Sequence, residues 1–176
     1  MIINSSKAEM DAVLETAQRM CAAARTAPKA KGQDYIHTCI LTGEHLEILA
    51  LKMEEASNEL GYKFFLRDAE NVRASKAVVL IGVENERRGL GVGCSYCGHE
   101  GCNGCKEAGG ICAFGPLDLG IAVGAAVSVA ADARIDNRAM FSVGRSALDL
   151  GFFDKSVTEV LGIPLSVSGK SPYFDR

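Results

Sequence analysis

The feature that most constrains this chain is a cluster of cysteines in the middle of its 176 residues. Five of the seven cysteines lie close together, at Cys94, Cys97, Cys102, Cys105 and Cys112. An odd number of cysteines crowded into one segment is not the pattern of a disulfide framework, which needs even pairing across the chain. Close C-x-x-C spacings let one tight loop turn several thiolates inward, and a last cysteine arrives from farther along. The spacing therefore predicts a metal centre in a cysteine-rich loop at residues 91–114.

Two kinds of metal centre suit these thiols. A [4Fe–4S] cluster needs four converging thiolates, and the glycines of the loop supply both positive φ angles and backbone N–H groups for cluster sulfur. Structural zinc is the alternative, because Cys94-x-x-Cys97 and Cys102-x-x-Cys105 resemble a compact zinc site with four thiolate ligands. The four residues between the two pairs are few for a common zinc ribbon. A metal-free redox thiol site is the third interpretation. We expect the cluster, with His99 a solvated loop residue, since the thiols already exceed the number of ligands needed.

Charge and hydropathy exclude several classes of function. The net charge of −3 leaves no basic surface of the kind that binds nucleic acid. The first residues lack a basic segment followed by an apolar one, so we expect no signal peptide. The uncharged stretch Leu119–Ala131 is too short to span a bilayer, and we expect no membrane role. We therefore expect a single domain at residues 1–176 and a cytoplasmic protein with reduced thiols.

Hydrophobic periodicity predicts helices and strands in alternation. A capping box at Ser6-x-x-Glu9 begins a helix that runs to Ala24, since apolar residues recur there at steps of three and four. The apolar, β-branched run Ala77–Val83 is typical of a strand buried on both faces. The other expected helical segments are Glu44–Leu60, Leu117–Ala133 and Ser146–Gly151, and the other expected strands are Tyr35–Leu41, Ala139–Val143 and Leu165–Ser168. This order predicts an α+β fold, an α/β sandwich with helices flanking a central sheet.

The cysteine motif and the segments that follow it resemble a known family. The run Cys-x-x-Cys-Gly-x-x-x-Cys looks like the short [4Fe–4S] motif of several anaerobic redox proteins, whose fourth ligand lies downstream. Over essentially the whole chain the sequence is similar to the uncharacterised ferredoxin domain-containing family DUF2148. The segments that carry this similarity are Cys112-Ala-Phe-Gly-Pro-Leu-Asp-Leu-Gly, Asp136-Asn-Arg-Ala-Met, Gly162-Ile-Pro-Leu-Ser and the ending Gly169-Lys-Ser-Pro-Tyr-Phe-Asp-Arg176. The resemblance implies Cys94, Cys97, Cys102 and Cys112 as the ligands, with Cys105 a spare or alternative thiol.

A second resemblance concerns the scaffold. The segment Ala23-Ala-Arg-Thr-Ala-Pro-Lys-Ala-Lys-Gly-Gln-Asp34, followed by a strand, is similar to the helix–loop–strand of FMN-dependent nitroreductases, and Val160-Leu-Gly-Ile-Pro164 fits their later pattern. The resemblance implies a central mixed sheet, a homodimer and a site for FMN. Two departures are the cysteine insertion and the absence of any arginine before Arg19, where that family usually holds the flavin phosphate. The candidate contacts to FMN are Arg25, Lys29 and Lys31, and a solvated basic loop is the alternative.

Three functions are consistent with these features. The leading one is an iron–sulfur redox protein that serves electron transfer or redox catalysis with an unidentified redox partner. The first alternative is an FMN-dependent oxidoreductase with an accessory [4Fe–4S] cluster, and the second is an interaction module stabilised by zinc. These functions differ in the cofactor that they predict. The first predicts iron with sulfide, the second adds flavin, and the third predicts one zinc per chain, whose removal unfolds the protein.

Overall fold

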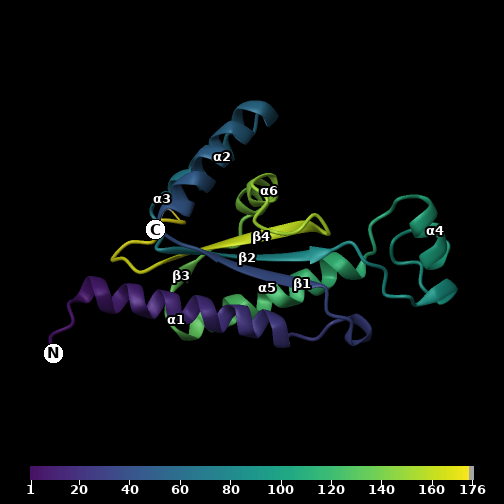
Figure 1. The fold of residues 1–176 in the computed structure, drawn as a ribbon, viewed down its shortest axis with the longest axis horizontal. Helices are drawn as coiled ribbons and strands as arrows, with labels where there is room; N and C mark the ends of the chain where they lie inside the picture. Colours follow the sequence, from purple (N-terminus) through teal and green to yellow (C-terminus); the bar gives the residue numbers. More distant parts are fainter. Residues whose placement is uncertain (175–176) are drawn as a thin grey trace.

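Four strands form one antiparallel sheet at the centre of the fold, which the computed structural model describes for residues 1–174 (Figure 1). The last two residues of the predicted domain and of the family-like ending, 175 and 176, lie outside this range. The strand order is β1-β2-β4-β3, and the bounds are Ile36–Leu41 for β1, Ala77–Glu84 for β2, Val157–Ser166 for β4 and Asp136–Asn137 for β3. Each strand pair in this part of the chain is antiparallel, so the sheet is not the mixed one that we expected. The two-helix connection between β1 and β2 returns the chain beside β1 in the opposite direction.

Helices cover both faces of this sheet (Figure 1). On one face lie α1 (Ser5–Thr26) and α5 (Phe114–Asp132), and on the other lie α2 (Glu44–Leu60), α3 (Phe64–Arg73) and α6 (Phe141–Asp149). A short helix, α4 (Gly101–Glu107), lies in the cysteine-rich loop, and two 3-10 turns occupy Ala30–Gly32 and Gly91–Gly93. The arrangement confirms the α+β class and the sandwich of helices around a sheet.

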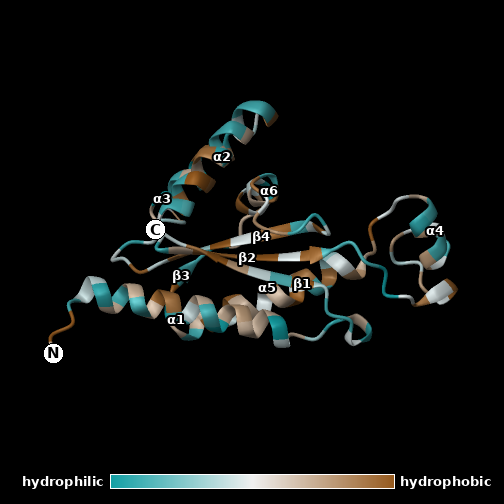
Figure 2. Ribbon diagram, viewed as in Figure 1, coloured by the Kyte–Doolittle hydropathy of each residue, from teal (hydrophilic) through white to brown (hydrophobic). Residues whose placement is uncertain are grey.

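Strand β2 is the centre of two hydrophobic layers. Val79 and Ile81 pack with α1 and α5, whereas Val78 and Leu80 pack with α2, α3 and α6. All four side chains are fully buried, and Figure 2 shows the corresponding hydrophobic colour along β2. The prediction of a strand buried on both faces is therefore confirmed.

Helix α5 is built largely from small apolar residues. In the described part of the chain it is the one helix whose length and composition suit a membrane span. One of its faces is nevertheless in the protein core, where Ala122, Ala126 and Ala130 are fully buried against α1 and the sheet. A buried core helix satisfies the same composition test, so this property is weak evidence for a membrane.

The start of the chain departs in detail from the prediction. Helix α1 is capped by Asn4, whose Oδ1 atom accepts a hydrogen bond of 2.9 Å from the backbone N–H of Lys7. The predicted capping box at Ser6 and Glu9 is therefore wrong, because Ser6 already lies inside the helix. The side chain of Asn4 satisfies an N–H group that has no partner within the helix.

The segment after β3 is the largest departure. We expected a strand at Ala139–Val143, but Met140 forms only a single bridge with Gly162 before α6 begins at Phe141. Helix α6 is pressed against β4 at Gly144, where an added Cβ atom would lie 1.8 Å from the carbonyl oxygen of Val160. Gly144 thus lets α6 pack directly on β4, and the β propensity of residues 139–143 does not predict this tertiary contact.

Strand β4 is much longer than the predicted Leu165–Ser168. It begins at Val157 and runs through Pro164, which pairs with Val78. The N–H of Gly162 points away from β2, toward Met140, and Pro164 has the same orientation two residues later. The missing N–H of Pro164 therefore costs no bond to β2.

Candidate metal centre

The cysteine-rich loop belongs to the connection between the end of β2 at Glu84 and the start of α5 at Phe114. This connection projects beyond the end of the sheet (Figure 1). The two ends of the loop lie side by side, because a Cβ atom added to Gly115 would lie 3.8 Å from the carbonyl oxygen of Glu84. All seven cysteines of the chain are free thiols. The loop is therefore a compact excursion whose thiols are available for coordination.

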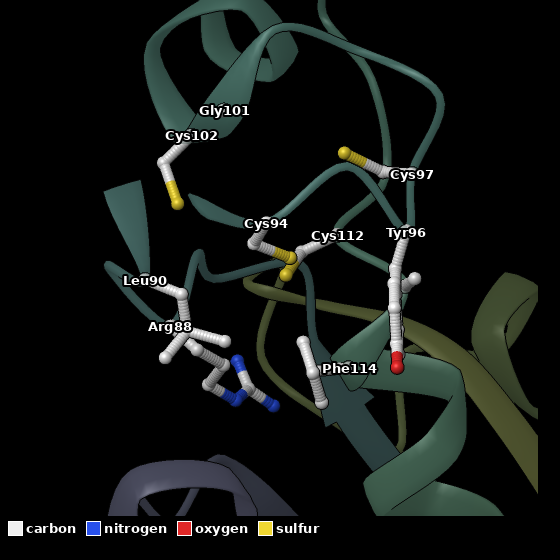
Figure 3. A pocket seen from close by; sticks show the side chains of 10 residues that line it. Arg88, Leu90, Cys94, Tyr96, Cys97, Gly101, Cys102, Cys112 and Phe114 are labelled. Carbon is white, nitrogen blue, oxygen red and sulfur yellow. The ribbon is translucent and has the colours of Figure 1, made fainter. Parts of the chain in front are cut away.

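Four of the thiols line one pocket, and they are the four predicted ligands. Cys94, Cys97, Cys102 and Cys112 turn their sulfur atoms into this pocket (Figure 3). Its wall is completed by Arg88 and by apolar or aromatic side chains, among them Leu90, Tyr96 and Phe114. The space between them is about 10 Å³. Within residues 1–174 no group of three or more His, Cys, Asp or Glu side chains has the arrangement that holds a metal ion.

The donor set nevertheless suits an iron–sulfur cluster or zinc. Thiolates are the ligands that such centres take, and the four cysteine side chains supply them without a competing carboxylate. His99 lies outside this pocket, on a neighbouring surface hollow with Val92 and Ser95. The identity of the four ligands stays a prediction, since it requires the loop to close around the centre.

Cys105 differs from the other four thiols of the loop. Its side chain is 1% exposed and is not part of the pocket wall. Burial raises the pKa of the Cys105 thiol, and the neighbouring thiol of Cys97 raises it further, while Arg87 acts in the opposite direction. The Cys105 thiol thus lies beside Cys97, one of the predicted ligands, and stays a spare or alternative thiol.

Two contacts hold the loop in its shape. The side chain of Asn85 donates from Nδ2 to the carbonyl oxygen of Gly110 (3.3 Å) and accepts at Oδ1 from the backbone N–H of Cys112 (3.1 Å). The rings of Tyr96 and Phe114 stack with centroids 5.6 Å apart. Asn85 thus positions Cys112, and the aromatic pair covers one side of the pocket. No sequence motif singles out Asn85, so sequence reasoning missed it.

A buried ion pair between Arg88 and Asp118 contributes its arginine to the wall of the pocket. Arg88 is 1% exposed, and its Nε and Nη2 atoms donate to Oδ2 of Asp118 at 3.1 and 2.9 Å. The guanidinium group also donates to the carbonyl oxygen of Glu86 and lies 4.6 Å from the ring centroid of Tyr35. Sequence reasoning missed this pair. A signal was present, because Asp118 is the one charged residue in the otherwise uncharged run 114–131.

The three candidate FMN contacts already bind groups of their own chain. Arg25 pairs with Asp34 at 2.5 Å, and Lys31 donates to the carbonyl oxygen of Gly89 at 3.1 Å. The Lys29 side chain is 5% exposed, and its ammonium group donates to the carbonyl oxygens of Ala24 and Arg25 at the end of α1. Lys29 thus completes the C-terminus of a helix, where a cation is favourable. Their role toward a flavin stays a prediction.

A second cavity, of about 330 Å³, lies between α5, α6 and β4. Its walls are mainly apolar, with Phe141, Leu148 and Leu161 among them, and it also contains Arg145 and Glu159. Both carboxylate oxygens of Glu159 are inaccessible to water and have no hydrogen bond of normal geometry within the described residues. Burial raises the pKa of the Glu159 carboxyl group, and the Thr158 side chain offsets part of this effect.

Comparison with solved structures shows the fold. A nitroreductase family protein from Clostridium novyi is similar with a TM-score of 0.61 and 15% identity, covering 95% of this chain and 76% of that one. A nitroreductase with bound FMN from Desulfitobacterium hafniense is similar with a TM-score of 0.61 and 9% identity, covering 89% of this chain and 78% of that one. The nitroreductase-like scaffold that the sequence predicts is therefore confirmed.

Comparison of sequences shows the family. The family described as an uncharacterised protein containing a ferredoxin domain (DUF2148) matches residues 108–176, a range that contains Cys112 but not the other loop cysteines. An uncharacterised protein of Archaeoglobus fulgidus is 46% identical over 184 residues, covering 100% of this chain and 98% of that protein. The chain thus belongs to the DUF2148 family of uncharacterised ferredoxin domain-containing proteins.

Proposed function

We propose that this protein is a cytoplasmic iron–sulfur redox protein that acts in electron transfer or redox catalysis. The observation that supports the proposal best is the gathering of Cys94, Cys97, Cys102 and Cys112 on one pocket. A [4Fe–4S] cluster bound there would supply one-electron chemistry. Membership of a family with a ferredoxin domain agrees with a redox role.

The residues around the thiols have separate tasks in this proposal. Asn85 holds the backbone at Cys112, so that this ligand approaches from the α5 side of the pocket. Tyr96 and Phe114 keep water from that side of the centre. Gly101, with a φ of 67°, lies so close to the turn at Gly91 that an added Cβ atom would be 2.8 Å from its carbonyl oxygen. The loop is thereby folded back on itself beside Cys102.

The test is the cofactor content of protein purified without oxygen. We expect about four irons and four sulfides per chain, with a broad visible absorption that bleaches on reduction by dithionite. Cys112→Ser should lose most of this iron, whereas Cys105→Ser should retain it, because the Cys105 side chain lies outside the pocket wall. Colourless protein with one zinc per chain, which unfolds on chelation, would replace the redox proposal with a structural zinc module.

An FMN-dependent oxidoreductase is the second candidate function. It is favoured by the similarity of the fold to nitroreductases, one of which has bound FMN. The candidate contacts Arg25, Lys29 and Lys31 would have to exchange their present partners for the flavin. Heat denaturation of the anaerobic protein should then release a yellow chromophore, and Lys31→Ala should reduce the amount released. Protein that releases no flavin after reconstitution with FMN removes this candidate.

A further inference from the structure

We propose that Arg88 raises the reduction potential of the thiolate-bound centre, because it presents a fixed, buried positive charge to that centre. This inference rests on the proposed function, because it concerns a redox centre held by the four pocket cysteines. It adds a residue that is not a ligand and belongs to no sequence motif. The observation that carries it is the position of Arg88 in the same pocket wall as Cys94, Cys97, Cys102 and Cys112.

The charge of Arg88 is held rigidly. The side chain is 1% exposed and its guanidinium group binds Asp118 through two nitrogen atoms and Glu86 through the third. The ring of Tyr35 lies 4.6 Å from the guanidinium carbon, which adds a cation–π contact. A guanidinium group stays protonated at all ordinary pH values. The pocket therefore faces a cation that is held in a fixed orientation.

The ion pair has its positive end toward the thiols. Arg88 lines the pocket, whereas Asp118 does not and instead accepts a hydrogen bond of 3.0 Å from the backbone N–H of Ala30. Figure 3 shows the guanidinium group in the pocket with Cys94 and Cys112. The three bonds to Asp118 and Glu86 occupy three of the five guanidinium N–H groups and fix the orientation of the group.

The sign of the effect follows from the charge that reduction adds. One electron passes from the reductant to the centre, no covalent bond forms or breaks in the protein, and the centre becomes more negative by one unit. A nearby cation stabilises the reduced form more than the oxidised form, and burial strengthens this interaction. Asp118, which is not part of the pocket wall, opposes the effect.

Two substitutions should therefore shift the midpoint potential in opposite directions. Arg88→Gln removes the cation and should lower the potential, while Asp118→Asn removes the opposing anion and should raise it. We expect each shift to correspond to at least a tenfold change in the reduction equilibrium, about 59 mV for one electron. The measurement is an anaerobic redox titration followed by optical and paramagnetic resonance spectra, with iron and sulfide assayed on each sample. Arg145→Gln with Asp149→Asn, which removes an Arg–Asp pair on α6, is the matched control and should leave the potential unchanged.

The outcomes separate this inference from the proposed function. Wild-type protein without iron and sulfide would overturn the proposed function itself. Wild-type protein with the cluster, but with unchanged or equally directed potentials in the two variants, would overturn only the role of Arg88. If either single variant fails to fold, the double variant Arg88→Gln with Asp118→Asn leaves no uncompensated buried charge. It should still lower the potential, and Arg88→Lys, which keeps the cation, should stay nearer to the wild-type value than Arg88→Gln.

Discussion

At the scale of single residues, the structure treats the charged groups of Arg88 and Glu159, which are both shielded from water, differently. The Arg88 guanidinium group binds Asp118 through two nitrogen atoms and the carbonyl oxygen of Glu86 through the third, so its burial is compensated. The Glu159 carboxylate has no comparable partner in the second cavity, as far as the described residues go. An isolated buried charge is costly, and a carboxyl group in that position responds by holding its proton to higher pH.

Glu159 should therefore make stability depend on pH. Because the folded protein holds this proton more tightly than the unfolded chain does, the free energy of unfolding falls as the pH rises above the ordinary carboxyl pKa of 4.5. Glu159→Gln, which carries no charge, should be more stable than the wild type at pH 7.5, and the difference should shrink at pH 4. Urea denaturation at the two pH values measures this, with the exposed Glu59→Gln as control. A variant less stable than the wild type at pH 7.5 would contradict it.

At the scale of elements, the contact between α6 and β4 depends on glycine from both sides. An added Cβ atom at Gly144 would meet the backbone of Val160, and one at Gly162 would lie 2.0 Å from a methyl carbon of Val143. The helix therefore lies on the strand almost backbone to backbone. Such a contact tolerates no side chain, because well-packed interiors have no space to yield.

Gly144→Ala should destabilise the protein by about 1–3 kcal/mol or more, since the methyl group forces α6 away from β4. Gly169→Ala, in the exposed segment after β4, is the control, because an added Cβ atom there meets nothing within 4 Å. That second change should be neutral or stabilising by up to about 1 kcal/mol, because alanine loses less conformational entropy than glycine on folding. Chemical denaturation measures the free energy of unfolding of both variants. Equal losses would contradict the prediction, because they would show that α6 can move to accept the methyl group.

This contact also explains how far the elements could be predicted from sequence. Helices α1, α2 and α5 and strands β1 and β2 follow local hydrophobic periodicity, and their predicted bounds are close to the observed ones. Helix α3 had no such prediction, since its ten residues bury Asp68 and Asn71 along with apolar side chains. Helix α6 and the first part of β4 are fixed by their contact with each other. The same holds at the site, where the cysteines are visible in the sequence but Asn85 and the Arg88–Asp118 pair depend on tertiary contacts.

At the scale of the whole molecule, α5 presents an apolar stripe to the outside. Leu117 and Ile121 are 49% and 45% exposed one turn apart, and Gly120 and Gly124 beside them are exposed as well. Phe141 of α6, which shares the second cavity with Gly120, is 56% exposed. Small and apolar residues together allow another helix to approach closely. We propose that a second copy of this chain covers the stripe, in line with the homodimer that the nitroreductase resemblance implies.

Light scattering after size-exclusion chromatography should therefore give twice the chain mass of 18.6 kDa. Ile121→Glu should convert the dimer to a monomer, because it places a charge in the centre of the apolar contact. Ser128→Glu changes an exposed residue near the other end of the same helix and serves as a comparison for the extent of the interface. A wild-type protein that is monomeric at micromolar concentration would contradict the proposal.

The meeting of the two ends of the cysteine-rich loop has a consequence for how such a protein evolves. Neither hydrophobic cluster, as far as the structure describes the chain, contains a residue from 85 to 113, and the loop leaves and rejoins the body at one point between Glu84 and Gly115. The two hydrophobic clusters therefore form without this segment. Selection can alter or lengthen the part beyond Arg88 at little cost to the rest of the fold, whereas deletion of the whole segment would remove Arg88 and leave Asp118 as a buried carboxylate without its partner.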